Sequence, residues 1–370
     1  MAFLGQCRAT GIGSLPHTDA RAAVEAVFEF CPDLPHWPQL PKVSPLEGMN
    51  EQALEGFPGL RVEGRRLRHV QDDAFFEGVE RIFAAHAAGD ASVAAMSPEA
   101  AHGFAPFLEA VGKRRPREAK GQVAGPVTVG MAVLGEGGNP ILYDDVLRDV
   151  LEKFLSLRVR WQAEQLRAAG AEPVVFVDEP FLASFGTPFF NWDVERVRAT
   201  LDAVLAGAGL RPGIAGLRPG GAGDAAAGSH CCSNTDWSIF LGSRLQVVSF
   251  DAFEFAENFL VYRDDLAAYL SRGGNIAWGI VPTDPEALAA ATADALRARL
   301  LGLVKKVEAL GFRREQVLRQ SLVTPACGLG TRSMDTARHA LGLARDVAAA
   351  LRREYLGATQ QDEPKRRGSR

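Results

Sequence analysis

Short apolar stretches alternate with longer amphipathic stretches along almost the whole chain. Five of the apolar stretches are nearly continuous in hydrophobic residues and end near Pro, Gly, Asp or Thr, as strands buried on both faces do. They cover residues 122–130, 172–180, 245–253, 275–283 and 321–330. The same pattern predicts strands near residues 6–12 and 65–70, and a short strand that enters His230.

The stretches between these strands repeat their apolar residues every three to four positions, as helices that cover a sheet do. They span about residues 143–169, 191–206, 256–271, 285–310 and 333–354. The stretch 285–310 has the clearest local signals, because Thr283 or Asp284 can cap its start and Pro285 suits its first turn. Gly311 follows its last apolar residues and is expected to end it.

About eight strands, each followed by a helix, predict a single (β/α)8 TIM barrel over residues 1–356. An open, doubly wound sheet is the alternative fold for the same pattern. Residues 31–64 are too rich in proline for a helix, and we expect a long loop over the C-terminal mouth of the barrel. Residues 210–229 are expected to form a surface connection, and the polar residues 357–370 a disordered tail.

Composition and charge exclude several classes of partner. Of the 370 residues, 47% are hydrophobic and 23% charged, which is typical of a soluble globular protein with ample material for a core. A formal net charge of −4 argues against nucleic acid and against an anionic membrane surface as partners. No apolar run is long enough to span a membrane and no signal-peptide pattern opens the sequence, so we expect a cytoplasmic protein. Its five cysteines are expected to be free thiols.

One short segment, GSHCCSNTDW, holds a histidine and two adjacent cysteines. Side chains alternate along a strand, so His230 and Cys232 share a face while Cys231 points the other way and is expected in the core. Asp251 and Cys327 end two further predicted strands, and the C-terminal strand ends of a barrel meet on one face. Imidazole, thiolate and carboxylate groups suit Zn²⁺, so the sequence predicts a zinc site formed by His230, Cys232, Asp251 and Cys327.

Five motifs follow one another at predicted strand ends. They are GIGSLP (11–16), GPVT (125–128), VDEP (177–180), HCCSNTDW (230–237) and CGLGTR (327–332). In this order they resemble the catalytic half of the cobalamin-independent methionine synthases, whose wider relatives are the uroporphyrinogen decarboxylase-like barrels. The resemblance covers roughly residues 8–350 and implies a TIM barrel that transfers a methyl group.

In that family a zinc ion held by His, Cys, Glu and Cys binds the thiol of homocysteine. Matched motif by motif, the resemblance implies His230, Cys232 and Cys327 as metal ligands. The family's glutamate falls at Asp251, whose carboxylate is one methylene shorter and either ligates after a closer approach of the strand or lies just outside the metal's own ligands. Glu254, three residues further on, is the alternative carboxylate.

The resemblance also implies residues that bind the amino-acid end of homocysteine. Ser14 and the turn that contains Ile12 match the family's first motif, Asp178 matches its aspartate in DEP, and a looser match adds Glu47. Asp178, together with His230 and Cys232, is then expected to carry catalysis. Without the resemblance, Asp178 and its neighbour Glu179 could equally be solvated carboxylates of a turn that ends a strand.

The implied reaction moves a methyl group to a thiol, most readily homocysteine to give methionine, because zinc coordination keeps a thiol deprotonated. The full-length synthases carry a second barrel that helps to bind methyl-folate, and this chain matches only the catalytic one. The methyl donor is therefore either methyl-folate or a methylated corrinoid protein. Two alternatives stay open: a decarboxylase-like lyase on the same barrel, and a zinc- or corrinoid-binding accessory protein without turnover.

Overall fold

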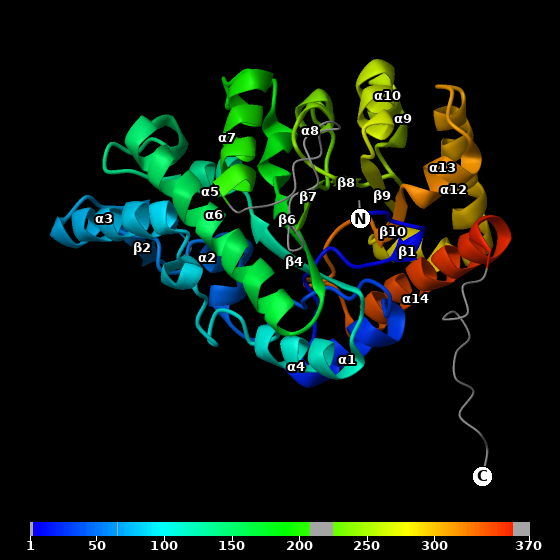
Figure 1. The fold of residues 1–370 in the computed structure, drawn as a ribbon, viewed down its shortest axis with the longest axis horizontal. Helices are drawn as coiled ribbons and strands as arrows, with labels where there is room; N and C mark the ends of the chain where they lie inside the picture. Colours follow the sequence, from blue (N-terminus) through cyan, green and yellow to red (C-terminus); the bar gives the residue numbers. More distant parts are fainter. Residues whose placement is uncertain (1–2, 65, 208–224, 358–370) are drawn as a thin grey trace, which may run out of the picture.

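The computed structural model describes residues 3–64, 66–207 and 225–357, and its centre is a curled, fully parallel sheet surrounded by helices (Figure 1). The sheet has seven strands in the order β1-β10-β9-β8-β7-β6-β4. They are β1 (Arg8–Ala9), β4 (Glu118–Ala124), β6 (Glu172–Asp178), β7 (Ala226–Cys231), β8 (Val247–Phe250), β9 (Asn275–Val281) and β10 (Ser321–Pro325). This arrangement confirms the predicted α/β class with a TIM-barrel-like sheet.

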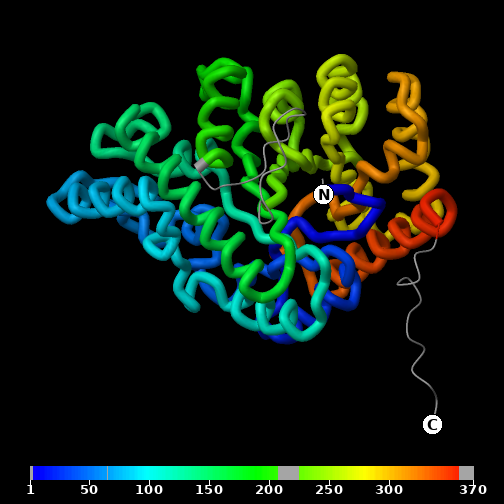
Figure 2. Tube along the Cα trace, in the orientation of Figure 1, coloured from blue at the N-terminus to red at the C-terminus, as the bar shows by residue number. Residues whose placement is uncertain are grey.

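Helices follow the strands and cover the outside of the curl (Figure 1). The longer ones are α1 (Ala20–Phe30), α3 (Asp73–Ala88), α4 (Phe104–Arg114), α6 (Asp145–Ala168), α7 (Val194–Gly207), α10 (Arg263–Ser271), α12 (Ala293–Glu308) and α14 (Met334–Leu351). The shorter ones are α2 (Met49–Ala53), α5 (Pro126–Ala132), α8 (Ser238–Gly242), α9 (Ala256–Leu260), α11 (Pro285–Ala290) and α13 (Arg314–Arg319). Figure 2 shows the first and last parts of the described chain side by side, as the pairing of β1 with β10 requires.

Two predicted helices are each split in two. The predicted helix 285–310 begins as expected, since the Asp284 side chain accepts from two backbone N–H groups of α11. It is interrupted before Thr292, whose hydroxyl accepts from the N–H of Ala295 and starts α12 as a new helix. The prediction of one continuous helix was therefore wrong, and the predicted helix 256–271 likewise divides into α9 and α10.

The predicted barrel strand at residues 65–70 was also assigned wrongly. β3 (Arg66–His69) belongs to a separate three-stranded sheet, between β2 (Leu60–Glu63) and β5 (Val133–Leu134). Its alternation of exposed Arg66 and partly exposed Arg68 with buried Leu67 and His69 suits a sheet with one solvated face, whereas a central barrel strand is buried on both faces.

In the main sheet, the space between β4 and the segment after β1 is occupied by residues 36–39. His36 makes a parallel bridge to Lys120 of β4, and Gln39 makes one to Ser14. These residues come from the proline-rich stretch 31–64, which elsewhere contains α2 and β2. The expectation that this stretch is a loop without a helix was therefore wrong, because α2 lies in a part of it that has no proline. The expected position of that stretch over the barrel mouth stays a prediction.

Buried side chains form two clusters, one on each face of the curled sheet. In β6, Val175 and Val177 belong to the larger cluster beneath the helices, and Val174 and Phe176 to a smaller one on the inner face. The inner cluster consists of Phe3, Leu34, Val174, Phe176, Ala226, Val247, Ala277 and Leu322. It fills the middle of the curl, so the polar side chains that follow it gather at the C-terminal strand ends.

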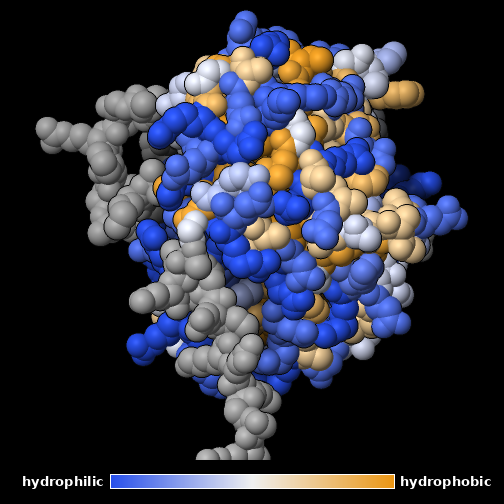
Figure 3. Space-filling view, turned by 90° about the vertical axis from the view of Figure 1, so that its right-hand side faces the viewer, coloured by the Kyte–Doolittle hydropathy of each residue, from blue (hydrophilic) through white to orange (hydrophobic). Residues whose placement is uncertain are grey.

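The outer surface carries no large apolar face on the side shown in Figure 3, where hydrophobic residues occur in small groups among hydrophilic ones. None of the helices in the described ranges has the length and hydropathy of a membrane crossing. Most of the predicted surface connection at 210–229 lies outside the described residues, and its last residues belong to β7. The predicted tail lies outside them from residue 358 onward.

Candidate metal centre

A histidine and two cysteines meet at the C-terminal end of the sheet. His230 lies in β7, Cys232 directly follows this strand, and Cys327 lies two residues after β10. One ring nitrogen of His230 and the sulfurs of Cys232 and Cys327 all lie within 4.8 Å of one another. His230 is buried while both cysteines are partly exposed, so the cluster is reachable from the surrounding solvent.

The ring of His230 is oriented by the neighbouring strand. Its Nδ1 lies 3.0 Å from the hydroxyl oxygen of Ser249 in β8, directly beside it in the sheet. Its Nε2 is buried and has no hydrogen-bond partner among the described residues. A histidine that binds a metal through one ring nitrogen ordinarily forms a hydrogen bond with the other, as Nδ1 does here with Ser249. The free Nε2 is therefore suited to bind a metal ion together with the two sulfurs.

The pKa values of the two clustered cysteines are shifted in opposite directions. The hydrogen bond from Cys232 lowers the pKa of Cys327, and the nearby imidazole of His230 acts in the same direction. The pKa of Cys232 is raised, chiefly because it supplies that proton and also because it is buried. Two sulfurs and one imidazole are donors that suit Zn²⁺, whereas a hard metal ion such as Mg²⁺ prefers oxygen ligands.

Cys231, between the two clustered residues, faces the other way. It is fully buried in the larger core cluster, and its thiol donates to the carbonyl of Ser233 at 3.4 Å. Burial raises the pKa of Cys231 to about 12, so it stays a neutral thiol. This is the core position that the strand alternation predicts.

The structure does not bring Asp251 into the cluster. Asp251 directly follows β8, but its carboxylate is not among the ligand atoms that lie within 4.8 Å of one another. One carboxylate oxygen accepts from the backbone N–H of Glu254 at 2.9 Å, and burial raises the pKa of Asp251 to about 6. The side chain of Glu254 itself is exposed.

Asp178 and Glu179, at the end of β6, are both buried, so the alternative of two solvated carboxylates is wrong. Asp178 accepts from the backbone N–H of His230 at 3.0 Å, and burial raises its pKa while Lys120 and His230 oppose that rise. Glu179 accepts from the N–H groups of Val127 and Thr128 and from the Thr128 hydroxyl, at 2.6–2.9 Å. Glu179 therefore caps the start of α5, and Asp178 stands beside the histidine of the cluster.

The turn with Ile12 and Ser14 lies against the loop that carries Cys327. The Ser14 carbonyl accepts from the N–H of Leu329 at 2.9 Å, and its hydroxyl accepts from the N–H of Gly330 at 3.2 Å. A Cβ on Gly328 would lie 2.4 Å from the Ser14 hydroxyl oxygen, so a larger residue there would have to displace this hydroxyl from its bond to Gly330. The first motif and the last motif thus meet at the cluster.

Glu47 is buried and bound to groups of the protein itself. Its carboxylate accepts from the backbone N–H groups of Leu40 and His102 and lies 2.9 Å from the His102 ring nitrogen Nδ1. These contacts hold the proline-rich segment in place. Its part in substrate binding stays a prediction.

Sequence reasoning missed two polar residues of the inner face, Ser249 and Lys120. Ser249 could have been predicted to lie near the site, because it precedes Asp251 by two residues and therefore shares its face of the predicted strand. Lys120 is a charged residue within a fully buried strand, EAKGQVA, and such a residue is unusual unless it is paired or functional. Burial lowers the pKa of Lys120 to about 8, and it remains largely protonated at neutral pH.

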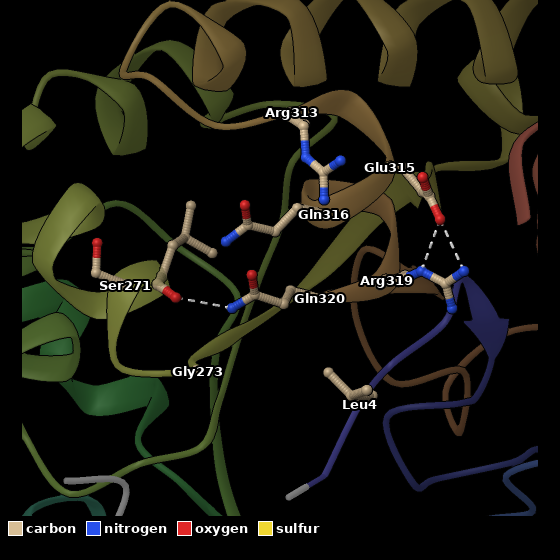
Figure 4. A pocket seen from close by; sticks show the side chains of 9 residues that line it. Leu4, Ser271, Gly273, Arg313, Glu315, Gln316, Arg319 and Gln320 are labelled. Atoms are coloured by element: carbon tan, nitrogen blue, oxygen red, sulfur yellow. Dashed lines mark hydrogen bonds and ion pairs between the residues drawn. The ribbon is translucent and has the colours of Figure 1, made fainter. Parts of the chain in front are cut away.

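A separate cavity of about 330 Å³ lies at the opposite end of the sheet, where β9 and β10 begin (Figure 4). Its polar groups are largely bound to one another: Gln320 donates to the carbonyls of Leu270 and Gly274, and Arg319 pairs with Glu315. Active sites of barrel enzymes lie at the C-terminal strand ends. The cluster, and not this cavity, is therefore the candidate site.

Comparisons with known proteins point to one family. The family model described as the catalytic domain of cobalamin-independent synthase matches residues 107–350, more than half of the chain. No curated protein matches the chain. A structure from Listeria monocytogenes, provisionally assigned as a vitamin-B12-independent methionine synthase, is 16% identical, with 89% of this chain and 86% of that chain covered and a TM-score of 0.51.

A second solved structure is a B12-independent methionine synthase from Shewanella sp. W3-18-1 in complex with selenomethionine. It is 19% identical, 68% of each chain is covered, and the TM-score is 0.44. The likeness to the Listeria structure shows a shared fold.

Proposed function

The chain belongs to the family of cobalamin-independent synthase catalytic domains, and from this we propose that it is a zinc-dependent methyltransferase whose acceptor is a thiol. Homocysteine, giving methionine, is the leading acceptor, and methyl-folate or a methylated corrinoid protein is the donor. The observation that carries the proposal is the cluster of His230, Cys232 and Cys327, in which the histidine Nε2 has no hydrogen-bond partner in the described part of the chain.

We infer that His230, through Nε2, and the sulfurs of Cys232 and Cys327 would hold the zinc ion. The bound ion would supply the positive charge that keeps an acceptor thiol deprotonated near neutral pH. Ser249 occupies Nδ1 of the imidazole, which leaves Nε2 as the nitrogen that would bind the ion. With Asp251 outside the cluster, these three ligands leave a position for the sulfur of the substrate.

Asp178 and the turn of Ile12 and Ser14 would bind the amino-acid end of the acceptor. The Asp178 carboxylate suits an ammonium group, and the turn offers a hydroxyl and backbone N–H groups to a carboxylate. Transfer of a methyl group to a thiolate held in this way needs alignment of the reacting atoms more than proton transfer. We also infer that residues 36–39 complete the seven strands to an eight-membered barrel, supported by their bridges on both sides.

The test is the zinc content of the protein purified without added metal. We expect one zinc per chain in the wild type and little in Cys327→Ser or Cys232→Ser, because each variant loses a sulfur ligand. Cys231→Ala is the matched control, since its thiol faces the core. X-ray absorption should then show one additional sulfur around the zinc after homocysteine is added.

The methyl donor is tested separately with this zinc-loaded protein, by measuring methionine formed from homocysteine and either methyl-folate or methylcobalamin. A wild-type protein without zinc, or zinc that is indifferent to Cys327 and to thiols, would contradict the proposed function.

A further inference from the structure

Lys120 is a buried cation on the inner face of the curled sheet. It lies in β4 with 1% of its surface exposed. Its Nζ donates to the carbonyl of Ile12 at 2.6 Å and to Oε1 of Gln122 at 3.1 Å, and lies 4.4 Å from the ring centre of Phe176. Burying an ammonium group is costly unless hydrogen bonds and a countercharge compensate, so this position calls for an explanation.

Lys120 has no carboxylate in direct contact among the described residues, and the acidic residue two positions before it in β4 is already paired. Arg8 and Glu118, at the opposite end of β4, lie 2.5 Å apart and satisfy each other. No ion pair within 4.0 Å joins Lys120 to any carboxylate in the described part of the chain. Asp178, at the C-terminal end of the adjacent β6, is the carboxylate whose charge acts on Lys120.

This separation leaves part of Asp178 free for a ligand. Its Oδ1 accepts from the N–H of His230, and no hydrogen bond to its Oδ2 occurs among the described residues. An ammonium group of a ligand can therefore bind Oδ2, while the positive charge of Lys120 on the adjacent strand partly compensates the negative charge of the carboxylate. The ammonium of Lys120 stays bound to Ile12 and Gln122.

Lys120 also fixes the turn that contains Ile12. The N–H of Gly11 donates to Nδ1 of His36, and the carbonyl of Gly13 accepts from the N–H of Gln39. Burial lowers the pKa of His36 to about 3, so this ring is neutral. Lys120 is thus the one charged side chain that bonds to residues 11–14 within the described ranges.

We propose that Lys120 is a positioning residue that makes the site selective for thiols with an α-amino-acid end over simple thiols, without contributing to metal binding. This deepens the proposed function and rests on it. Lys120 bonds to the Ile12 turn and its charge acts on Asp178 without direct contact, so it influences both elements expected to bind the amino acid. It does not belong to the His230–Cys232–Cys327 cluster. Loss of Lys120 should therefore weaken binding of the amino-acid end of the substrate and leave binding of its thiol unchanged.

The experiment compares two thiols on the full chain loaded with Co²⁺, whose absorption reports thiolate coordination. One thiol is homocysteine, and the other is 3-mercaptopropan-1-ol, which lacks both charged groups. In Lys120→Met we expect the affinity for homocysteine to fall about 10- to 100-fold, as for loss of a buried charged hydrogen-bonding group. The affinity for 3-mercaptopropan-1-ol and the content of one metal per chain should stay as in the wild type.

Lys153→Met is the matched control, because Lys153 lies on α6 and pairs with Asp149 at the surface. Lys120→Gln is the second variant: it keeps an N–H donor for Ile12 but lacks the charge, and the same loss of preference is expected. A folded Lys120 variant that keeps the wild-type preference for homocysteine would overturn the proposal.

Equal losses for both thiols, loss of the metal, or failure of both variants to fold would also overturn it, since each would show a role in the cluster or in the fold. A wild-type protein that binds neither metal nor homocysteine would instead contradict the proposed function. The two failures are therefore distinguishable.

Discussion

The hydrogen bond between Ser249 and His230 occupies one ring nitrogen and leaves the other, Nε2, available to a metal ion. Both residues are buried, and Nδ1 and Oγ lie 3.0 Å apart. With Nδ1–H donating to the hydroxyl, Nε2 carries a lone pair and can bind a metal ion. Ser249→Ala removes the acceptor and nothing else from the cluster.

The expected loss of zinc affinity follows from the burial of that N–H group. Without the hydroxyl, Nδ1–H has no acceptor among the described residues, and an unsatisfied buried donor costs about 1–3 kcal/mol. If the ring escapes this cost by taking the other tautomer or by turning, the same free energy is lost from metal binding. Ser249→Ala should therefore bind zinc about 10- to 100-fold more weakly, in the range found when outer partners of ligating histidines are removed.

Zinc affinity would be measured by competition with a chromophoric chelator, and folding of both metal-free proteins by urea denaturation. Ser229→Ala is the matched control: Ser229 precedes His230 in β7, is equally buried, and its hydroxyl has no hydrogen-bond partner in the described part of the chain. A zinc affinity of Ser249→Ala equal to that of the wild type, or an equal loss in Ser229→Ala, would refute the reasoning.

Three further changes test the inner and C-terminal parts of the sheet. Burial raises the pKa of Glu179 from 4.5 to about 7, so the folded chain binds this proton more tightly and the free energy of unfolding falls as the pH rises through that window. Glu179→Gln should flatten this decline in urea titrations, and an unchanged slope would contradict it. Gly228→Ala places a Cβ 2.3 Å from the ring of Phe176 and should lower the free energy of unfolding by about 1–3 kcal/mol. The double variant Gly228→Ala/Phe176→Leu should recover part of that loss. Wild-type stability of Gly228→Ala alone would contradict the prediction, because it would mean that the Phe176 ring moves aside without cost. Asp251→Ala should keep the wild-type zinc content, because the carboxylate stands outside the cluster; a loss like that in Cys327→Ser would make Asp251 a ligand.

The strands β6, β9 and β10 were predictable because their sequences are continuously apolar. The strand predicted at residues 122–130 starts four residues after the actual start of β4. Its first half was not recognised as a strand, because Lys120 and other polar residues there face the inner side of the curl. Its apolar continuation from Pro126 is helix α5, which begins at a proline and is capped by Glu179, a residue 53 positions beyond that proline. Apolar periodicity alone does not distinguish a short buried helix from a strand.

The candidate site shows the same division between local and distant signals. Strand alternation placed His230 and Cys232 on one face, and the structure has them together with Cys327. The direction of the Asp251 carboxylate depends on its bond to the N–H of Glu254, which a pattern of apolar residues does not report. The place of residues 36–39 in the sheet depends on bridges to Lys120 and Ser14, far away in sequence, so the proline-rich composition suggested only a loop.

Because of that placement, the part of the site next to residues 36–39 should open locally more easily than the part formed by β7 and β10. Four main-chain hydrogen bonds join the segment 35–39 to β4 and to residues 13–15, and its prolines have no N–H to add more. β7 and β10, which position the clustered histidine and cysteines, lie instead within the continuous ladder of the sheet. Amide hydrogens of Trp37 and Gln39 should therefore exchange with solvent sooner than those of β7. The segment beside the Ile12 turn can then open locally while the His230–Cys232–Cys327 cluster stays in place.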